Sequence, residues 1–450
     1  MKVDINDVKK FVTDELNTST KYLEIPSVSA QERGIKETVK YLIDWFKDLG
    51  ADQVITFDQY KNPAIFASFT GNSSKTVLFY NHYDVQPPDP LDEWESDPFK
   101  PTIRDGKLYA RGICDDKGEL MSRLAVVRYF KEHGGLPCNL KFFIEGEEEI
   151  GSPNIEKYAS DAAKYLTCDA VIWEGGGKNE AEKFQIIAGT KGIASFEAKV
   201  TTAESDAHSS LAPYLDNAAW RLVQGLSSLY GANRNIKVDH FYDNVQALSP
   251  YAAEQVKQQE ASFNAATVIN AFGVTQGKLP VNNPFSAVMT EPTITINGLS
   301  AGYEGPGVKT VIPRQATAKL DCRLVPGQDP ETIVGYLQDQ LVKNGFPDIK
   351  LHFLLGEDAY RTDLEDPFIQ LSSRIAAEIY GPDKVALIPN QPGGGPMLPF
   401  FKITQAPLMG IGVHYAASTP HAPNENIRIS DYAQASGYLA RLLEEFGQQA

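Results

Sequence analysis

The sequence predicts an α/β protein whose main domain is discontinuous: a mostly parallel sheet covered by helices, interrupted by an inserted α+β domain. Up to about residue 191, short apolar runs alternate with amphipathic segments, which indicates buried strands separated by helices. Beyond that point the pattern changes to half-exposed strands, and from about residue 362 the first pattern returns. A chain of 450 residues is long enough for two or three such cores. We therefore expect a main domain in two parts, 1–191 and 361–450, around an inserted domain over 192–360.

The first part contains the elements of a parallel sheet. Amphipathic stretches predict helices, and apolar runs predict strands buried on both faces. The expected order is helix 6–20, helix 33–49 closed by Gly50, strand 76–81, a hairpin near 104–111 that turns at Asp105-Gly106, helix 117–133, strand 139–145 and strand 170–173. Strands and helices that alternate at this spacing favour parallel pairing.

The inserted part is predicted to form one sheet with helices on one face. Its expected order is strand 193–201, helix 216–229, a partly helical stretch over 231–290, strand 292–297, strand 315–325 and helix 330–343. The last part of the chain returns to the main sheet with helix 367–380, strand 406–411 and helix 430–446.

Composition excludes several classes of protein. With 42% hydrophobic and 22% charged residues the chain is typical of soluble globular proteins, and no apolar run approaches the ~20 residues of a membrane span. A net charge of −16 disfavours phosphate backbones and anionic membranes, so we expect neither as a partner. The polar N-terminus and four scattered cysteines without a C-x-x-C pair favour reduced thiols in the cytoplasm.

Two short motifs beside expected elements could bind a metal. His82 and Asp84 follow strand 76–81, where one imidazole nitrogen could ligate a cation while the carboxylate holds the other ring nitrogen. The alternative is a loop histidine beside a solvated aspartate. Asp115 and Asp116 precede helix 117–133, where acids also complement the helix dipole, but a carboxylate there could bridge two cations.

A run of glutamates directly follows strand 139–145. It comprises Glu145, Glu147, Glu148 and Glu149, and a solvated loop would be the simplest explanation. A divalent cation would relieve their repulsion more fully, because carboxylates are hard ligands. One of them could instead be a general base that activates a metal-bound water.

Three further residues are weak evidence for a functional site when each is considered alone. Glu174 follows strand 170–173, His421 lies on a loop before the last helix, and His208 lies in the inserted domain, where each could be an ordinary surface residue. Four of the motifs, however, follow expected strands of one sheet and would meet at one edge. Histidines with several carboxylates suit zinc, cobalt or manganese, so metal-assisted hydrolysis is the expected reaction class.

Seven segments, taken together and in order, resemble the two-metal aminoacylase/carboxypeptidase/dipeptidase superfamily of metallopeptidases. The resemblance is closest to the branch that includes cytosolic non-specific dipeptidase and carnosinase. The segments are YNHYDVQP, DGKLYARGICDDKGE, FIEGEEEIGS, DAHSS, GPGVKTVIPR, KLDCRLVP and HAPNEN, and they cover nearly the whole chain. Their joint occurrence is specific, although each alone is not.

The resemblance implies hydrolysis of dipeptides or short peptides with a free C-terminal carboxylate, with two divalent metal ions per subunit. Zinc is the first expectation, with manganese or cobalt as alternatives. The implied metal ligands are His82, Asp115, Glu149, Glu174 and His421, with Asp115 bridging both ions. The implied catalytic residues are Glu148 as general base, Asp84 as support for His82, and His208 at the oxyanion. The implied substrate contacts are Arg323, Thr310, Gly394 and Gly395. A cis peptide bond between Asp115 and Asp116 is implied as well.

The resemblance further implies a homodimer joined through the inserted domain, in which His208 reaches the active site of the partner subunit. Three departures leave the substrate open. Glu174 stands where dipeptidase relatives usually have aspartate, Gly395 where they have serine, and Glu357 where a histidine is expected. Glutamate at position 174 is more typical of aminoacylases and carboxypeptidases, so an amidohydrolase acting on N-acyl amino acids is the alternative. A non-catalytic scaffold on the same fold is a third hypothesis.

Overall fold

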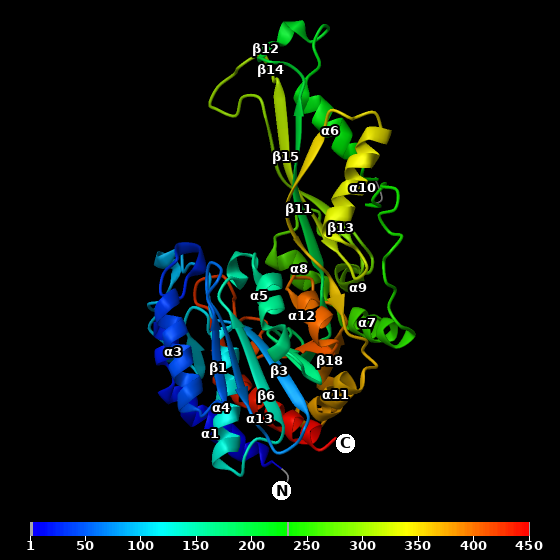
Figure 1. The fold of residues 1–450 in the computed structure, drawn as a ribbon. Coiled ribbons are helices and arrows are strands. Elements are labelled where there is room, and N and C mark those ends of the chain that lie inside the picture. Colours follow the sequence, from blue (N-terminus) through cyan, green and yellow to red (C-terminus); the bar gives the residue numbers. More distant parts are fainter. Residues whose placement is uncertain (1–2, 232–233, 450) are drawn as a thin grey trace.

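The computed structural model describes residues 3–231 and 234–449, and its strands form two large sheets in separate parts of the molecule (Figure 1). The wider part contains both chain termini and a ten-stranded sheet, with the path β1-β2-β6-β3-β7-β19-β9-β8-β20 and β18 paired to β9. The narrower part projects from it and contains a four-stranded sheet. The predicted fold class is confirmed.

The centre of the ten-stranded sheet is parallel and mostly buried. It consists of β6 (Asn139–Glu145), β3 (Thr76–His82), β7 (Ala170–Trp173) and β19 (Leu408–Gly410). Parallel strands bring their carboxyl ends to the same edge of a sheet. The residues that follow β3, β6 and β7 therefore meet at one place.

Helices cover both faces of this sheet, because alternate residues of its strands belong to two different cores. Val77 and Phe79 of β3 pack in one core, and Leu78 and Tyr80 pack in the other. The first core is closed by α1 (Ile5–Thr18), α3 (Ile35–Asp48), α4 (Lys117–Glu132), α11 (Pro367–Tyr380) and α13 (Ile429–Gly447). The second is closed by α5 (Ile155–Ala162) and α12 (Met397–Thr404).

The four-stranded sheet is antiparallel throughout, in the order β13-β15-β11-β16. Its strands are β11 (Gly192–Thr201), β13 (Thr293–Ala301), β15 (Gln315–Leu324) and β16 (Lys350–Glu357). Helices α6 (Ala218–Ser228) and α10 (Pro330–Lys343) cover one face, where alternate residues of β11 and β15 are buried. The other face, which we call the open face, carries the intervening side chains.

Most of the remaining elements are short. In the main part they are α2 (Lys21–Glu24), β4 (Thr102–Arg104), β5 (Lys107–Tyr109), β8 (Gly177–Lys178), β9 (Phe184–Ile187), β18 (Val385–Ile388), β20 (His414–Tyr415) and β21 (Asn426–Arg428). The stretch expected to be partly helical contains α7 (Pro250–Ser262), α8 (Ala265–Ala271) and α9 (Pro284–Thr290). At the far end of the narrow part β12 (Ala207–His208) pairs with β14 (Val311–Ile312). In the described part of the chain, no helix combines the length and the hydrophobicity needed to cross a bilayer.

Several strands were not expected from the sequence. They are β1 (Gln53–Phe57), β2 (Ala64–Phe69), β9, β16 and β18, of which β1 and β2 extend the sheet in antiparallel fashion. The domain boundaries near 192 and 361 stay predictions. They fall beside β10 (Gly189–Thr190) and β17 (Tyr360–Arg361), which pair with each other.

Candidate metal centre

Five expected ligands lie together where the parallel strands end. His82 is the last residue of β3, Glu174 directly follows β7, and Glu149 lies in a 3-10 turn (Glu148–Ile150) after β6. Asp115 precedes α4, and His421 arrives from the loop before β21. The site thus depends on strand ends brought to one edge by parallel pairing.

The ligand atoms form two groups that share one carboxylate. Oδ1 of Asp115 lies 3.0 Å from Nε2 of His82, which also lies 3.2 Å from Oε2 of Glu174. Oδ2 of Asp115 lies 3.0 Å from Nε2 of His421, which lies 3.3 Å from Oε2 of Glu149. Asp115 therefore presents one oxygen to each group. The peptide bond between Asp115 and Asp116 is cis, as predicted.

Asp84 is a buried residue that orients His82, Glu148 and Glu149. Nδ1 of His82 lies 2.9 Å from the Asp84 carbonyl oxygen and 3.4 Å from its carboxylate, which leaves Nε2 to face the ligand group. The same carboxylate accepts hydrogen bonds from the backbone N–H groups of Glu148 and Glu149. Asp84 is fully buried, so this link between β3 and the 3-10 turn is shielded from water.

The charges of this cluster are poorly balanced by the protein alone. Burial raises the pKa of Glu149 to about 8 and that of Glu148 to about 7, and it raises the pKa of Glu174 strongly. Oε2 of Glu174 is buried without a hydrogen-bond partner. The hydrogen bond with Asp115 raises the pKa of His421 to about 9. A set of carboxylate oxygens and imidazole nitrogens with an unsatisfied buried oxygen fits divalent cations in both groups.

Asp116 is a residue whose role sequence reasoning did not separate from that of Asp115. Its Oδ2 accepts hydrogen bonds from the His82 backbone N–H (2.9 Å) and the Asn81 side chain (2.6 Å). It lies close enough to His82 and Glu174 to belong to one possible ligand group. The hydrogen bonds of Asp116, however, fix the end of β3. In the sequence, only its adjacency to Asp115 indicated a role for Asp116.

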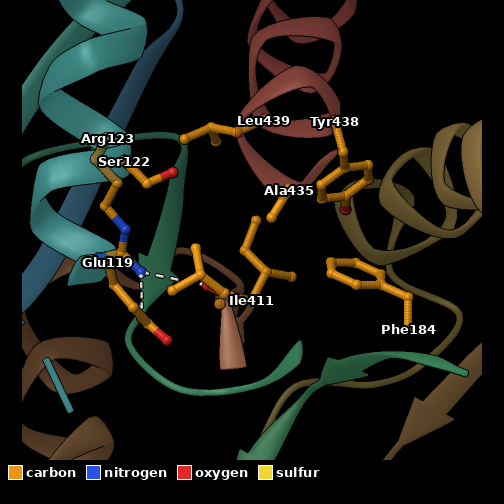
Figure 2. A pocket seen from close by; sticks show the side chains of 10 residues that line it. Glu119, Ser122, Arg123, Phe184, Ile411, Ala435, Tyr438 and Leu439 are labelled. Carbon is orange, nitrogen blue, oxygen red and sulfur yellow. Dashed lines mark hydrogen bonds and ion pairs between the residues drawn. The ribbon is translucent and has the colours of Figure 1, made fainter. Parts of the chain in front are cut away.

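Arg123 is a second residue that the sequence did not reveal. From α4 it donates to the Tyr80 carbonyl and the Asn81 side chain of β3, each at 2.6 Å, and to the Trp173 carbonyl of β7 at 2.7 Å. Figure 2 shows it beside Glu119 at a cavity between α4 and α13. With a volume of about 20 Å³ this cavity is too small for a peptide. Arg123 therefore supports the strands that carry the ligands.

The expected substrate contacts (Arg323, Thr310, Gly394 and Gly395) fall into two groups, and Glu357 and His208 lie among them. Arg323 and Glu357 lie at the base of the inserted sheet, and the charge of Glu357 acts on Glu148. Glu357 accepts the backbone N–H of Gly395 and lies against Gly394.

His208 and Thr310 form the second group, and the structure does not bring them to the ligands of the same chain. His208 is exposed, with Nε2 3.4 Å from Oγ1 of Thr310. Figure 1 places β12, which contains His208, at the opposite end of the molecule from β3.

Comparisons with known proteins agree with this geometry. A model of peptidase family M20/M25/M40 matches residues 78–445. The Cys-Gly metallodipeptidase dug1 of Schizosaccharomyces pombe is 30% identical over 362 residues, which are 76% of this chain and 75% of that protein. The Beta-Ala-His dipeptidase of Rattus norvegicus is 27% identical over 428 residues, covering 89% of this chain and 83% of that protein.

A solved structure extends the similarity to the whole fold. The M20 family metallo-carboxypeptidase Sso-CP2 from Sulfolobus solfataricus has a TM-score of 0.87 and 35% identity, over 97% of this chain and 99% of that chain. The match of the family model spans most of the sequence, including every strand end that carries a ligand candidate. The chain belongs to peptidase family M20/M25/M40.

Proposed function

We propose that the protein hydrolyses the amide bond of dipeptides or short peptides that have a free C-terminal carboxylate. The observation that carries this proposal is the pair of ligand groups around Asp115, each with a histidine and a further glutamate. One cation would be held by His82, Asp115 and Glu174, and the other by Asp115, Glu149 and His421. Zinc is the first candidate, and manganese or cobalt also suits this mixture of nitrogen and oxygen ligands.

Two such cations supply Lewis acidity, which polarises an amide carbonyl and lowers the pKa of water. Glu148 is the base in this scheme. Its backbone is fixed by Asp84, and burial holds its pKa at about 7 in the protein alone. It accepts a proton from the attacking water and passes that proton to the leaving amine. A base whose pKa lies near neutrality is well matched to this transfer.

Arg323 is the residue proposed to hold the C-terminal carboxylate of the substrate. A guanidinium group binds a carboxylate through two parallel hydrogen bonds, which fixes its orientation as well as its charge. Gly394 and Gly395 are proposed as further contacts, and Thr310, which lies beside His208, is proposed as a contact in the site of the partner subunit. The Gly393–Gly395 segment lies beside Lys191, the residue that precedes β11 (Lys191 N–H to the Gly393 carbonyl, 3.1 Å).

His208 is proposed to act in the site of the partner subunit, with the inserted domain forming the dimer. Its distance from the ligands of its own chain requires such an arrangement if it is to contact the substrate. Large apolar side chains are exposed on α6 and on the edge strand β13: Trp220, Val223, Ile296 and Leu299. An apolar helix and an unpaired strand edge are suited to association with a second copy. The four cysteines are all free, in line with the proposal of a cytoplasmic protein.

The test is a panel of dipeptides assayed with chelated protein to which zinc, cobalt or manganese is added back. We expect turnover to be lost on chelation and restored by at least one of these metals. Hydrolysis that persists after exhaustive chelation, or elemental analysis that finds no bound metal in an active preparation, would contradict the two-metal proposal.

A second candidate is an amidohydrolase that acts on N-acyl amino acids or trims peptides from the C-terminus. Glu174 and the similarity to the metallo-carboxypeptidase Sso-CP2 favour it. Parallel assays of free dipeptides, N-acetyl amino acids and longer peptides separate the two candidates. A scaffold without catalysis would show none of these activities.

A further inference from the structure

Two opposite charges lie in one row at the base of the open face. Ile193 of β11 pairs with Arg323 of β15 on one side and with Glu357 of β16 on the other. Partners in a ladder point to the same face, so these three side chains share the face opposite to the buried Ala194 and Cys322. A cation and an anion thus flank one apolar residue. Two strand spacings separate their Cα atoms by roughly 9–10 Å.

Glu357 is held in place by a segment built around it. Its carboxylate accepts the backbone N–H of Gly395, and a Cβ atom at Gly394 would lie 2.2 Å from its Oε2. The φ angle of Gly394 lies outside the left-handed region, so this glycine is explained by the close approach of the carboxylate and not by backbone conformation. The position of the Glu357 carboxylate is therefore fixed by the Gly394–Gly395 backbone that surrounds it.

The charge of Glu357 acts on Glu148, the proposed base, and Arg323 balances this charge only in part. Burial raises the pKa of Glu357, and Arg323 offsets this rise only in part. Its negative charge also contributes to the raised pKa of Glu148, after burial and other nearby carboxylates. A buried anion in this state is stabilised by a cation from the substrate.

We propose that Glu357 binds the free α-ammonium group of the substrate while Arg323 binds its terminal carboxylate, so that the row reads both charged ends of an unblocked dipeptide. This inference rests on the proposed function and deepens it. Two extended residues span at most about 7 Å, which fits between side chains that reach inward from strands two spacings apart. An N-acyl amino acid has no cation for Glu357, and a longer peptide cannot place both ends in the row. The class favoured is therefore zwitterionic dipeptides.

The test compares one substrate with its blocked form in each variant. kcat and KM are measured for Ala-Leu and for N-acetyl-Ala-Leu, in the metal-loaded enzyme and in Glu357→Gln. The quantity compared is kcat/KM for Ala-Leu divided by kcat/KM for N-acetyl-Ala-Leu. This ratio does not depend on the fraction of folded protein. We expect this ratio to fall by about 30-fold or more in Glu357→Gln, mainly through a higher KM for Ala-Leu, because a paired buried charge has been removed.

Two further variants serve as a second test and as a control for this result. Gly394→Ala introduces a methyl group into the space of the Glu357 carboxylate, so it should lower the ratio in the same direction. Asp358→Asn removes a neighbouring negative charge whose carboxylate lies 3.4 Å from Nζ of Lys402, and the ratio should stay within about twofold of the wild type.

Three outcomes would overturn the proposal. The first is an unchanged ratio in Glu357→Gln. The second is an equal fall in Asp358→Asn, which would indicate a general field effect. The third, measured with Lys-Leu in the same variants, is a loss of kcat/KM for Lys-Leu that Ala-Leu does not share, which would assign Glu357 to a basic side chain. Failure of the proposed function is distinguishable, since the wild-type enzyme would then hydrolyse neither Ala-Leu nor its N-acetyl form.

Discussion

Glu148 and Glu147 are adjacent glutamates with different surroundings. The carboxylate of Glu147 is occupied on both oxygens, by the Asn62 backbone N–H at 2.8 Å and the Asn154 side chain at 2.9 Å. The carboxylate of Glu148 lies among the charges of the ligand cluster. We infer that Glu147 stabilises the loop and that Glu148 is free to act on the attacking water.

Replacement of Glu148 by glutamine should abolish most turnover without emptying the metal site. We expect kcat to fall by about 10²–10⁴-fold, the usual loss when a general base is removed. Metal content by elemental analysis should stay near two ions per subunit, since Glu148 is not in either ligand group. Glu147→Gln is the matched control and should keep most of kcat. A near-normal kcat in Glu148→Gln would reassign the base.

For single residues, the sequence predicted the metal-ligand candidates better than the residues that hold them in place. His82, Asp115, Glu149, Glu174 and His421 could be picked out because the family motifs fix their order along the chain. The run of glutamates, in contrast, gives no indication of which carboxylates are hydrogen-bonded. That depends on groups more than 60 residues away in sequence, such as the Asn62 backbone and the Tyr80 hydroxyl.

Among the secondary-structure elements, Arg123 of α4 holds the ends of strands β3 and β7 together. It donates to carbonyl or amide oxygens of β3 and β7, and the Glu119 carboxylate lies 3.4 Å away. Arg123→Leu should lower the free energy of unfolding by about 3–5 kcal/mol, because buried acceptors and the Glu119 charge lose their partner. It should also weaken metal binding, measured by competition with a chelator.

The control for this variant is Arg128, five residues further along the same helix. Arg128 makes an ion pair with Glu15 at 2.9 Å in a partly exposed position, and Arg128→Leu should cost only about 0–1 kcal/mol. Equal destabilisation by both substitutions, in denaturant titrations, would show that Arg123 has no special role.

Central elements were predictable and peripheral ones were not. The apolar runs of β3, β6 and β7 identify buried parallel strands, and helix 330–343 matches the structure at both ends. β16 has mostly exposed or half-buried side chains, so its sequence lacks a buried run. The hairpin β1–β2 was not predicted, because its strands are short and the connection over 58–63 is longer than a tight two-residue turn, although the residues of the two strands pair in register.

For the molecule as a whole, loss of the metal ions should make stability sensitive to pH. In the protein alone the pKa values of Glu148, Glu149 and His421 are raised to about 7, 8 and 9, above those of an unfolded chain. The folded state then binds protons more tightly, so stability falls as pH rises from about 5 to 8. The chelated protein should melt at a lower temperature at pH 8 than at pH 6.

Calorimetry of metal-loaded and chelated protein at both pH values checks this sign. Bound cations take the place of the extra protons, so the gain in melting temperature on metal addition should be larger at pH 8. A gain that is smaller at pH 8 would contradict the assignment of these carboxylates to the metal centre.

The proposed dimer predicts complementation between two inactive subunits. Mixing His208→Ala with Glu148→Gln in equal amounts gives half hybrid dimers, each with one intact site of two. Activity should return to about a quarter of the wild-type value after subunit exchange. Proven exchange without recovery, or a fully active monomer, would refute the shared site.

The span of chain that closes the metal centre has a consequence for biosynthesis. Asp115 and His421 meet across 306 residues of sequence, so a nascent polypeptide lacks one ligand group until His421 has left the ribosome. The first group, at His82 and Glu174, can form long before. A hydrolase assembled in this order gains its second metal position only after His421 has been synthesised. Its chemistry is thereby withheld from chains that still lack this histidine.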